Sequence, residues 1–156
     1  MPKIDLDSVE ARTGSTYPEP YASQMGGRSF QALGDTAGLT QFGVNLVTMP
    51  PGALSSLRHW HSGEDEFVWV VSGELVLVQD GGETVLRAGD AAGFKAGDPD
   101  GHHLRNRSGA VASFLVIGTR GASDTCTYPD ADLINRTEGA RNWFTLRDGT
   151  FVKEAS

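Results

Sequence analysis

The fold of this chain is decided by residues 58–73, which read RHWHSGEDEFVWVVSG. His59 and His61 are separated by one residue, so on a β-strand their side chains share a face, because side chains alternate with period two. Glu66 follows five residues later, after a short polar turn, at the head of an apolar run. Nitrogen and oxygen donors that converge from adjacent strands are what a divalent transition metal requires. The spacing therefore predicts a metal site.

Outside this stretch, short apolar runs alternate with turn signals, which indicates an all-β chain. The 156 residues include 20 Gly and 7 Pro, and these fall largely between the runs. A helical period is not sustained anywhere, and only a short helical turn near 130–135 is expected. The strands that we expect are 29–33, 41–49, 57–61, 66–71, 74–79, 83–87, 91–94, 102–106, 110–118, 142–146 and 150–153.

The composition excludes several classes of partner. Asp and Glu number 20 against 13 Lys and Arg, a net charge of −7, which disfavours binding to nucleic acid or to an anionic membrane. No apolar stretch approaches the length of a membrane span. The single Cys126 excludes an internal disulfide, and the polar start lacks the apolar core of a secretory signal. We therefore expect a cytoplasmic protein without nucleic-acid or membrane partners.

With these residues in view, the chain resembles the cupin superfamily. The first cupin motif, a glycine, His-x-His, a glutamate and a second glycine, is matched by Gly52, His59, His61, Glu66 and Gly73. Of the acidic residues at 64–66, only Glu66 satisfies both the spacing before it and the spacing after it. One extra residue separates Gly52 from His59, which a bulge would absorb without moving the ligand positions.

A second, more degenerate cupin motif runs from Gly89 to Asn106. Lys95 stands where the motif usually has proline, and the approach to its histidine is two residues longer than usual. Two histidines compete for the ligand position. His102 lies four residues before Asn106, as the motif requires, whereas His103 has the opposite strand parity. We choose His102 and retain His103 as the alternative.

The resemblance implies a jelly-roll barrel, also called a double-stranded β-helix, that holds one divalent metal ion. Residues 1–27 would form an N-terminal arm, 28–120 the cupin barrel, and 121–156 a short extension packed on the barrel. The implied metal ligands are His59, His61, Glu66 and His102. Three imidazoles and one carboxylate suit Fe, Mn, Ni, Zn or Cu, and the sequence does not choose among them.

The function that the resemblance implies is metal-dependent chemistry on a small organic molecule, of the dioxygenase, isomerase or lyase and decarboxylase type. The alternative is a non-catalytic module that binds a sugar or an acid with the help of the metal. A fold does not fix a function, and no separate catalytic base stands out in the sequence. We expect a homodimer from the habit of the family, with the arm at 1–27 available to add to a partner's sheet edge.

Overall fold

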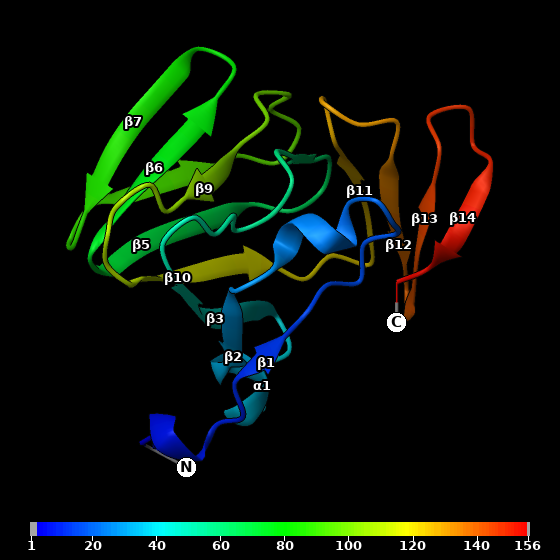
Figure 1. Cartoon of the computed structure of the whole chain (residues 1–156). Coiled ribbons are helices and arrows are strands. Elements are labelled where there is room, and N and C mark those ends of the chain that lie inside the picture. Colours follow the sequence, from blue (N-terminus) through cyan, green and yellow to red (C-terminus); the bar gives the residue numbers. More distant parts are fainter. Residues whose placement is uncertain (1–2, 156) are drawn as a thin grey trace.

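The computed structural model describes residues 3–155, so Met1 and Pro2 of the expected arm and Ser156 of the expected extension lie outside it. Its elements are almost all strands (Figure 1). In chain order they are η1 (Leu6–Ser8), β1 (Arg12–Thr13), η2 (Ala22–Met25), β2 (Ser29–Ala32), α1 (Leu33–Thr36), β3 (Phe42–Met49), β4 (Trp60–His61), β5 (Glu66–Ser72), β6 (Glu74–Gln79), β7 (Gly82–Arg87), β8 (Ala91–Phe94), β9 (His103–Arg105), β10 (Ala112–Thr119), β11 (Ser123–Thr127), β12 (Ile134–Glu138), β13 (Arg141–Thr145) and β14 (Phe151–Glu154).

The strands form three antiparallel sheets. The largest has the order β1-β2-β3-β10-β5-β8, and a three-stranded sheet has the order β7-β6-β9. The third sheet, β14-β13-β12-β11-β4, carries the C-terminal strands and the short strand β4. An isolated bridge between His59 and His102 connects the last two sheets. The all-β jelly-roll architecture expected from the sequence is confirmed.

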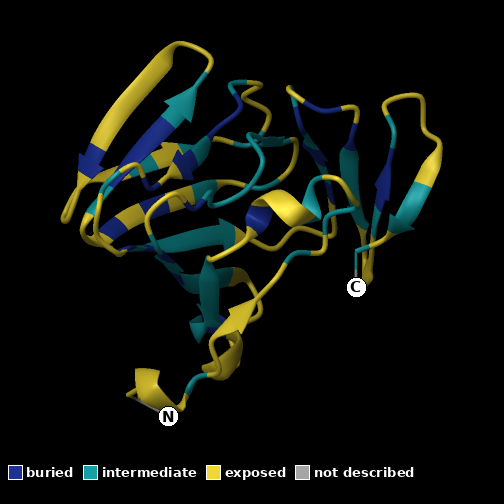
Figure 2. Cartoon of the chain, viewed as in Figure 1, coloured by how far each residue is buried: buried dark blue, intermediate teal, exposed yellow. Residues whose placement is uncertain are grey.

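The main core lies between the six-stranded and the three-stranded sheets. Strand β5 shows how the sequence makes it, because Val68 and Val70 are buried while Phe67 and Trp69 are exposed on the outer face. Figure 2 shows buried positions concentrated along the inner strands, with exposed positions on the N-terminal segment and on β7. The buried core residues are Val47, Met49, Ala53, Val68, Val70, Leu75, Leu77, Leu86, Leu104, Ala112 and Phe114.

Gly73 closes the first motif at the turn between β5 and β6, where only glycine fits. Its φ is +75°, a left-handed conformation that L side chains rarely adopt. A Cβ there would lie 2.8 Å from the Cβ of Ala112 and 2.9 Å from the carbonyl oxygen of Val111. The turn can therefore press against β10 only because this position lacks a side chain.

A second, smaller core joins the N-terminal segment to the C-terminal sheet. Cys126, Tyr128, Ala131, Leu133 and Phe144 are buried together. Tyr17 packs edge-on against Tyr128, with ring centroids 5.5 Å apart, and lies 5.9 Å from the ring of Phe144. The N-terminal segment is thus tied to the far end of the chain by aromatic packing.

The sequence missed three strands, β1, β11 and β12, and the short helix α1. Strands β11 and β12 lie where the sequence predicted no strand, and the helical turn expected near 130–135 is wrong, because Ile134 begins β12. The buried positions of β11 are Asp124 and Cys126, so the strand lacks the apolar alternation that identifies strands.

None of the helices in residues 3–155 is long and apolar enough to cross a membrane.

Candidate metal centre

Three elements bring the predicted ligands to one point. His59 precedes β4 and His61 ends it, Glu66 begins β5, and His102 precedes β9. The Nε2 atoms of His59 and His61 lie 3.6 and 3.5 Å from Oε2 of Glu66, and Nε2 of His102 lies 3.5 Å from Oε1. The glutamate is therefore the centre on which three imidazoles converge.

Backbone pairing fixes the segment that carries His59. Its amide donates to the carbonyl oxygen of His102 at 3.1 Å, and the His102 amide donates to the His59 carbonyl oxygen at 2.9 Å. Strand β4 then pairs on its other edge with β11, where Cys126 lies opposite His61. The donor segment is held between two sheets, which limits how far its imidazoles can move.

Hydrogen bonds decide the tautomers of His59 and His61. Nδ1 of His59 lies 2.9 Å from the carbonyl oxygen of Leu57, and Nδ1 of His61 lies 2.6 Å from Oδ2 of Asp124. A carbonyl or carboxylate oxygen only accepts, so each Nδ1 carries the proton and donates it. In the neutral imidazoles the lone pair is then on Nε2, the atom that faces Glu66.

His102 is nearly fully buried, at 4% exposure, and both of its ring nitrogens lack a hydrogen-bond partner. Its ring stacks on Phe94, with centroids 3.4 Å apart and an interplanar angle of 3°. Burial lowers the pKa of His102 and so favours its neutral form. A neutral imidazole nitrogen without a partner, aimed at a carboxylate, is costly in an apolar barrel unless a cation lies between them.

The charges of the cluster support the same arrangement. Burial raises the pKa of Glu66, but the three imidazoles, whose Nε2 atoms lie 3.5 to 3.6 Å from its oxygens, outweigh burial and hold that pKa well below its usual range. Burial lowers the pKa of His61, yet hydrogen bonds with Asp124 and Glu66 raise it to about 10 overall. A proton on His61 thus compensates the carboxylates in the absence of metal, and a bound divalent ion would take over that role.

Sequence analysis missed Asp124, which lies on the unexpected strand β11. Its Oδ2 accepts from His61, and its Oδ1 accepts the backbone N–H of Gly63 at 2.9 Å. Gly63 is needed for this approach, because a Cβ there would lie 2.9 Å from the carbonyl oxygen of Ser123. A carboxylate that receives the second N–H of a metal-binding imidazole orients the ring and raises its basicity. No motif in the sequence pointed to this residue.

Further donor atoms lie beside the predicted set. His59, Glu66 and His102 offer ligand atoms that are all within 4.8 Å of one another. His61 belongs to two neighbouring groups of the same size, one with His59 and Cys126, the other with Glu64 and Asp124. Cys126 had no role in the site predicted from the sequence, and the structure buries it beside His59 and His61. Burial raises the pKa of its thiol, which keeps the sulfur protonated.

The structure separates His102 from His103. His103 begins β9, and its Nδ1 lies 3.0 Å from the carbonyl oxygen of Ser56, so Nδ1 donates and Nε2 carries the lone pair. Both histidines line the cavity inside the barrel, but only His102 lies against Glu66. Arg58 points away from the donors and forms ion pairs with Asp80 and Asp130.

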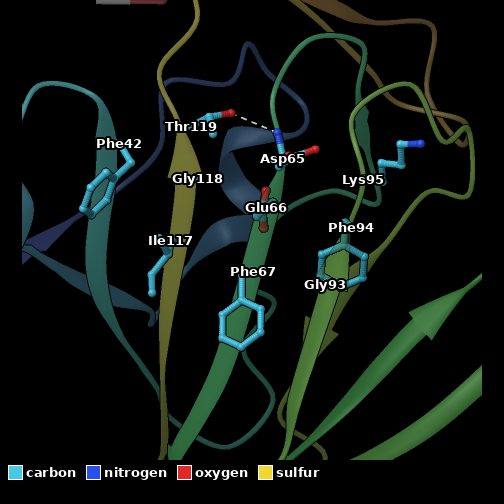
Figure 3. A pocket seen from close by; sticks show the side chains of 10 residues that line it. All are labelled: Phe42, Asp65, Glu66, Phe67, Gly93, Phe94, Lys95, Ile117, Gly118 and Thr119. Carbon is cyan, nitrogen blue, oxygen red and sulfur yellow. Dashed lines mark hydrogen bonds between the residues drawn. The ribbon is translucent and has the colours of Figure 1, made fainter.

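Two cavities meet at Glu66. The donor cavity inside the barrel has a volume of about 160 Å³ and is lined by His59, His102 and His103 together with Ser55 and Ser56. A larger groove of about 620 Å³ crosses the outer face of β3, β10, β5 and β8. Figure 3 shows Phe42, Ile117 and Phe67 along this groove. Most of the groove's exposed surface is apolar, whereas the imidazoles of His59 and His102 line the smaller cavity.

Comparison with known proteins identifies the fold and a similar structure. The sequence model of the Cupin_2 cupin domain matches residues 45–118. A crystal structure from Silicibacter pomeroyi, described as a sugar phosphate isomerase from the cupin superfamily, is 51% identical over 97% of each chain, with a TM-score of 0.94.

Two further solved structures are more distant. A protein from Acidithiobacillus ferrooxidans, provisionally described as a sugar phosphate isomerase, is 28% identical over 80% of each chain, with a TM-score of 0.73. The polyketide cyclase RemF from Streptomyces resistomycificus is 22% identical over 76% of this chain and 79% of its own, with a TM-score of 0.61, and shares the fold. No curated protein matches the sequence.

Proposed function

This chain belongs to the cupin superfamily, and on that premise we propose that it is a metal-dependent enzyme that isomerises a phosphorylated sugar. His59, His61, Glu66 and His102 would hold one divalent ion. The observation that carries the proposal is the convergence of three imidazole Nε2 atoms on one buried carboxylate, at 3.5 to 3.6 Å. The substrate class comes from the similar protein of Silicibacter pomeroyi.

The donor set fits Fe, Mn, Ni, Zn or Cu, because imidazole nitrogens and one carboxylate oxygen suit all of these ions. Four protein ligands leave room on a five- or six-coordinate ion for one or two oxygens of a small molecule. Such an ion supplies a Lewis acid that stabilises negative charge on a substrate oxygen. Asp124 and the Leu57 carbonyl oxygen would keep the Nε2 lone pairs of His61 and His59 directed at it.

His103 is the residue that we assign to proton transfer. An isomerisation of a sugar moves a proton between neighbouring carbon atoms, which requires a base within reach. The Ser56 carbonyl oxygen fixes the proton of His103 on Nδ1 and leaves Nε2 as the acceptor. The hydroxyl groups of Ser55 and Ser56, which line the same cavity, are available to hydroxyl groups of the substrate.

Metal analysis of protein purified without chelators tests the first half of the proposal. We expect stoichiometric metal in the wild type and none in His59→Ala, since this variant removes one of the converging donors. A matched His103→Gln variant should keep its metal, because His103 is not among the ligands. Wild-type protein that stays metal-free after reconstitution with each candidate ion would refute the proposal.

Turnover tests the second half. Wild-type protein loaded with each ion is incubated with pentose and hexose phosphates, and the products are followed by NMR. We expect isomerisation that is lost in His61→Ala and strongly reduced in His103→Gln with its metal retained. Tight binding of sugar or acid ligands without any turnover would favour the non-catalytic module instead.

The homodimer expected from the sequence stays a prediction. Phe67 and Trp69 are exposed on the outer face of the large sheet, where an apolar surface is available to a second copy. Light scattering coupled to size exclusion should give twice the chain mass. A monomer that persists at high concentration would contradict the prediction.

A further inference from the structure

A cavity of about 410 Å³ lies between the N-terminal segment and the C-terminal sheet, and it is not lined by any of the four predicted metal ligands. Its size is within the range of small-molecule sites. One side is aromatic and consists of Tyr17, Phe30, Tyr128 and Phe144. The remaining lining is polar, with hydroxyl groups from the loop that follows β1 and amide groups from β12 and β13. Aromatic rings on one side and hydroxyl, amide and guanidinium groups on the other offer a small polar ligand both packing and hydrogen bonds.

Among the residues that the structure describes, Arg28 is the one charged residue that lines this cavity. Its Nη1 donates to the Gly14 carbonyl oxygen at 3.2 Å, while its Nε is buried and has no partner. Within residues 3–155, no carboxylate lies within 4.0 Å of this guanidinium, whereas six other arginines each pair with one. These six are Arg12, Arg58, Arg87, Arg107, Arg120 and Arg141.

The charge of the cavity differs from that of the chain. The whole chain carries a net charge of −7, yet within residues 3–155 no acidic residue lines the cavity. Burial lowers the pKa of Arg28, which reflects the cost of holding a cation without a counter-charge. An anion would remove that cost, and a guanidinium offers a planar pair of N–H donors that matches two oxygens of a phosphate or a carboxylate.

Neighbouring hydroxyl groups add hydrogen-bond donors for a third oxygen of the bound anion. The Ser15 hydroxyl oxygen accepts the Tyr17 backbone N–H at 3.1 Å, which leaves its own O–H free to donate. Thr13 and Thr16 line the same wall. A planar carboxylate is satisfied by the guanidinium alone, whereas the third oxygen of a phosphate monoester needs these further donors.

We propose that this cavity binds a small phosphate monoester at Arg28, in a second ligand site that is separate from the metal donors. None of the four metal ligands lines it. Tyr17 and Tyr128 stand between it and His59, with ring centroids 5.5 Å apart for the tyrosine pair and 6.2 Å apart for Tyr128 and His59. The site therefore goes beyond the proposed function and does not need a metal to form.

Calorimetric titration of the chelator-treated full chain tests this site, with glucose 6-phosphate, gluconate and glucose as probes. We expect saturable binding of glucose 6-phosphate and much weaker binding of gluconate and glucose. Arg28→Gln should weaken the binding of glucose 6-phosphate by about tenfold or more, the usual loss for hydrogen bonds to a charged group. Arg87→Gln, at an arginine outside the cavity that pairs with Glu74, should bind as the wild type does.

Thr16→Glu provides a second test that leaves the buried residues unchanged, because Thr16 is exposed at the cavity. The added carboxylate should repel the phosphate and weaken binding even if Arg28→Gln does not fold. Thermal melts establish that each variant is folded. Three outcomes would overturn the proposal: no binding by the wild type, unchanged affinity in both variants, or gluconate binding as tightly as glucose 6-phosphate. Binding that requires the metal would also overturn it. A wild type that takes up none of the candidate ions on reconstitution but still binds the probe would refute only the proposed enzyme.

Discussion

The barrel and the C-terminal sheet meet at the same cluster of imidazoles, but they are built from different side chains. The barrel core is aliphatic apart from Phe114 and supplies Glu66, whose strand lies in the large sheet. The smaller core has Tyr128 and Phe144 packed against Tyr17, and the C-terminal sheet directs Asp124 at the donors. The large sheet thus contributes the carboxylate at the centre of the cluster, whereas β11 of the C-terminal sheet orients one of the imidazoles.

The largest expected effect is on the stability of the smaller core. Phe144→Ala removes a ring that is 2% exposed, and such truncations cost about 3–5 kcal/mol of unfolding free energy. Leu75→Ala is the matched change in the barrel, at about 2–5 kcal/mol. Urea denaturation of the chelator-treated proteins measures both. A loss below about 1 kcal/mol for Phe144→Ala would show that the C-terminal sheet does not depend on this aromatic packing.

An intermediate effect is expected at Asp124. Asp124→Asn keeps the shape of the side chain but removes the charge that His61 Nδ1–H faces at 2.6 Å. Losses of about 10- to 100-fold in metal affinity are typical when such an orienting partner is removed. Competition with a chelator measures the affinity, and Glu138→Gln in the same sheet is the control. Equal affinities in Asp124→Asn and wild type would mean that the sheet has no orienting role.

The smallest effect is expected at Cys126. Although its sulfur lies within 4.8 Å of donor nitrogens, burial keeps the thiol protonated, so we expect it to stay outside the coordination sphere. Cobalt-substituted wild type should then lack an intense near-ultraviolet thiolate band, and Cys126→Ser should keep its metal content and its spectrum. A band that disappears in Cys126→Ser would make β11 a source of a metal ligand as well as of the orienting carboxylate, and would break the division between the two regions.

The sequence predicted most of the barrel because its strands carry visible signals. Phe67, Val68, Trp69 and Val70 form a β-branched and aromatic run that ends at a Ser-Gly turn, and glycine turns separate the neighbouring hairpins, so β5 and its neighbours followed from local composition. The choice of His102 over His103 followed from the motif spacing to Asn106 and from parity, and in the structure Nε2 of His102 lies 3.5 Å from Glu66. These features are local, and a local reading of the sequence suffices for them.

The C-terminal contribution could not be predicted in the same way. Asp124 and Cys126 occupy the buried face of β11, so the carboxylate that orients His61 is also the residue that removes the apolar alternation by which a strand is recognised. Contact between β11 and β4 joins residues more than sixty positions apart, and no local pattern encodes it. Arg28 lacked a signal for the same reason, since its missing carboxylate partner becomes visible only in three dimensions.

The short strand β4 affects which parts of the molecule unfold together in local opening. It is only two residues long, yet its segment exchanges backbone hydrogen bonds with His102 on one side and pairs with β11 on the other. An ion held by His59, His61 and Glu66 would fasten this link and stabilise it by mass action. Amide hydrogen exchange in β11 and β12 should then slow together with exchange in β5, so that two separately opening units become one cooperative unit.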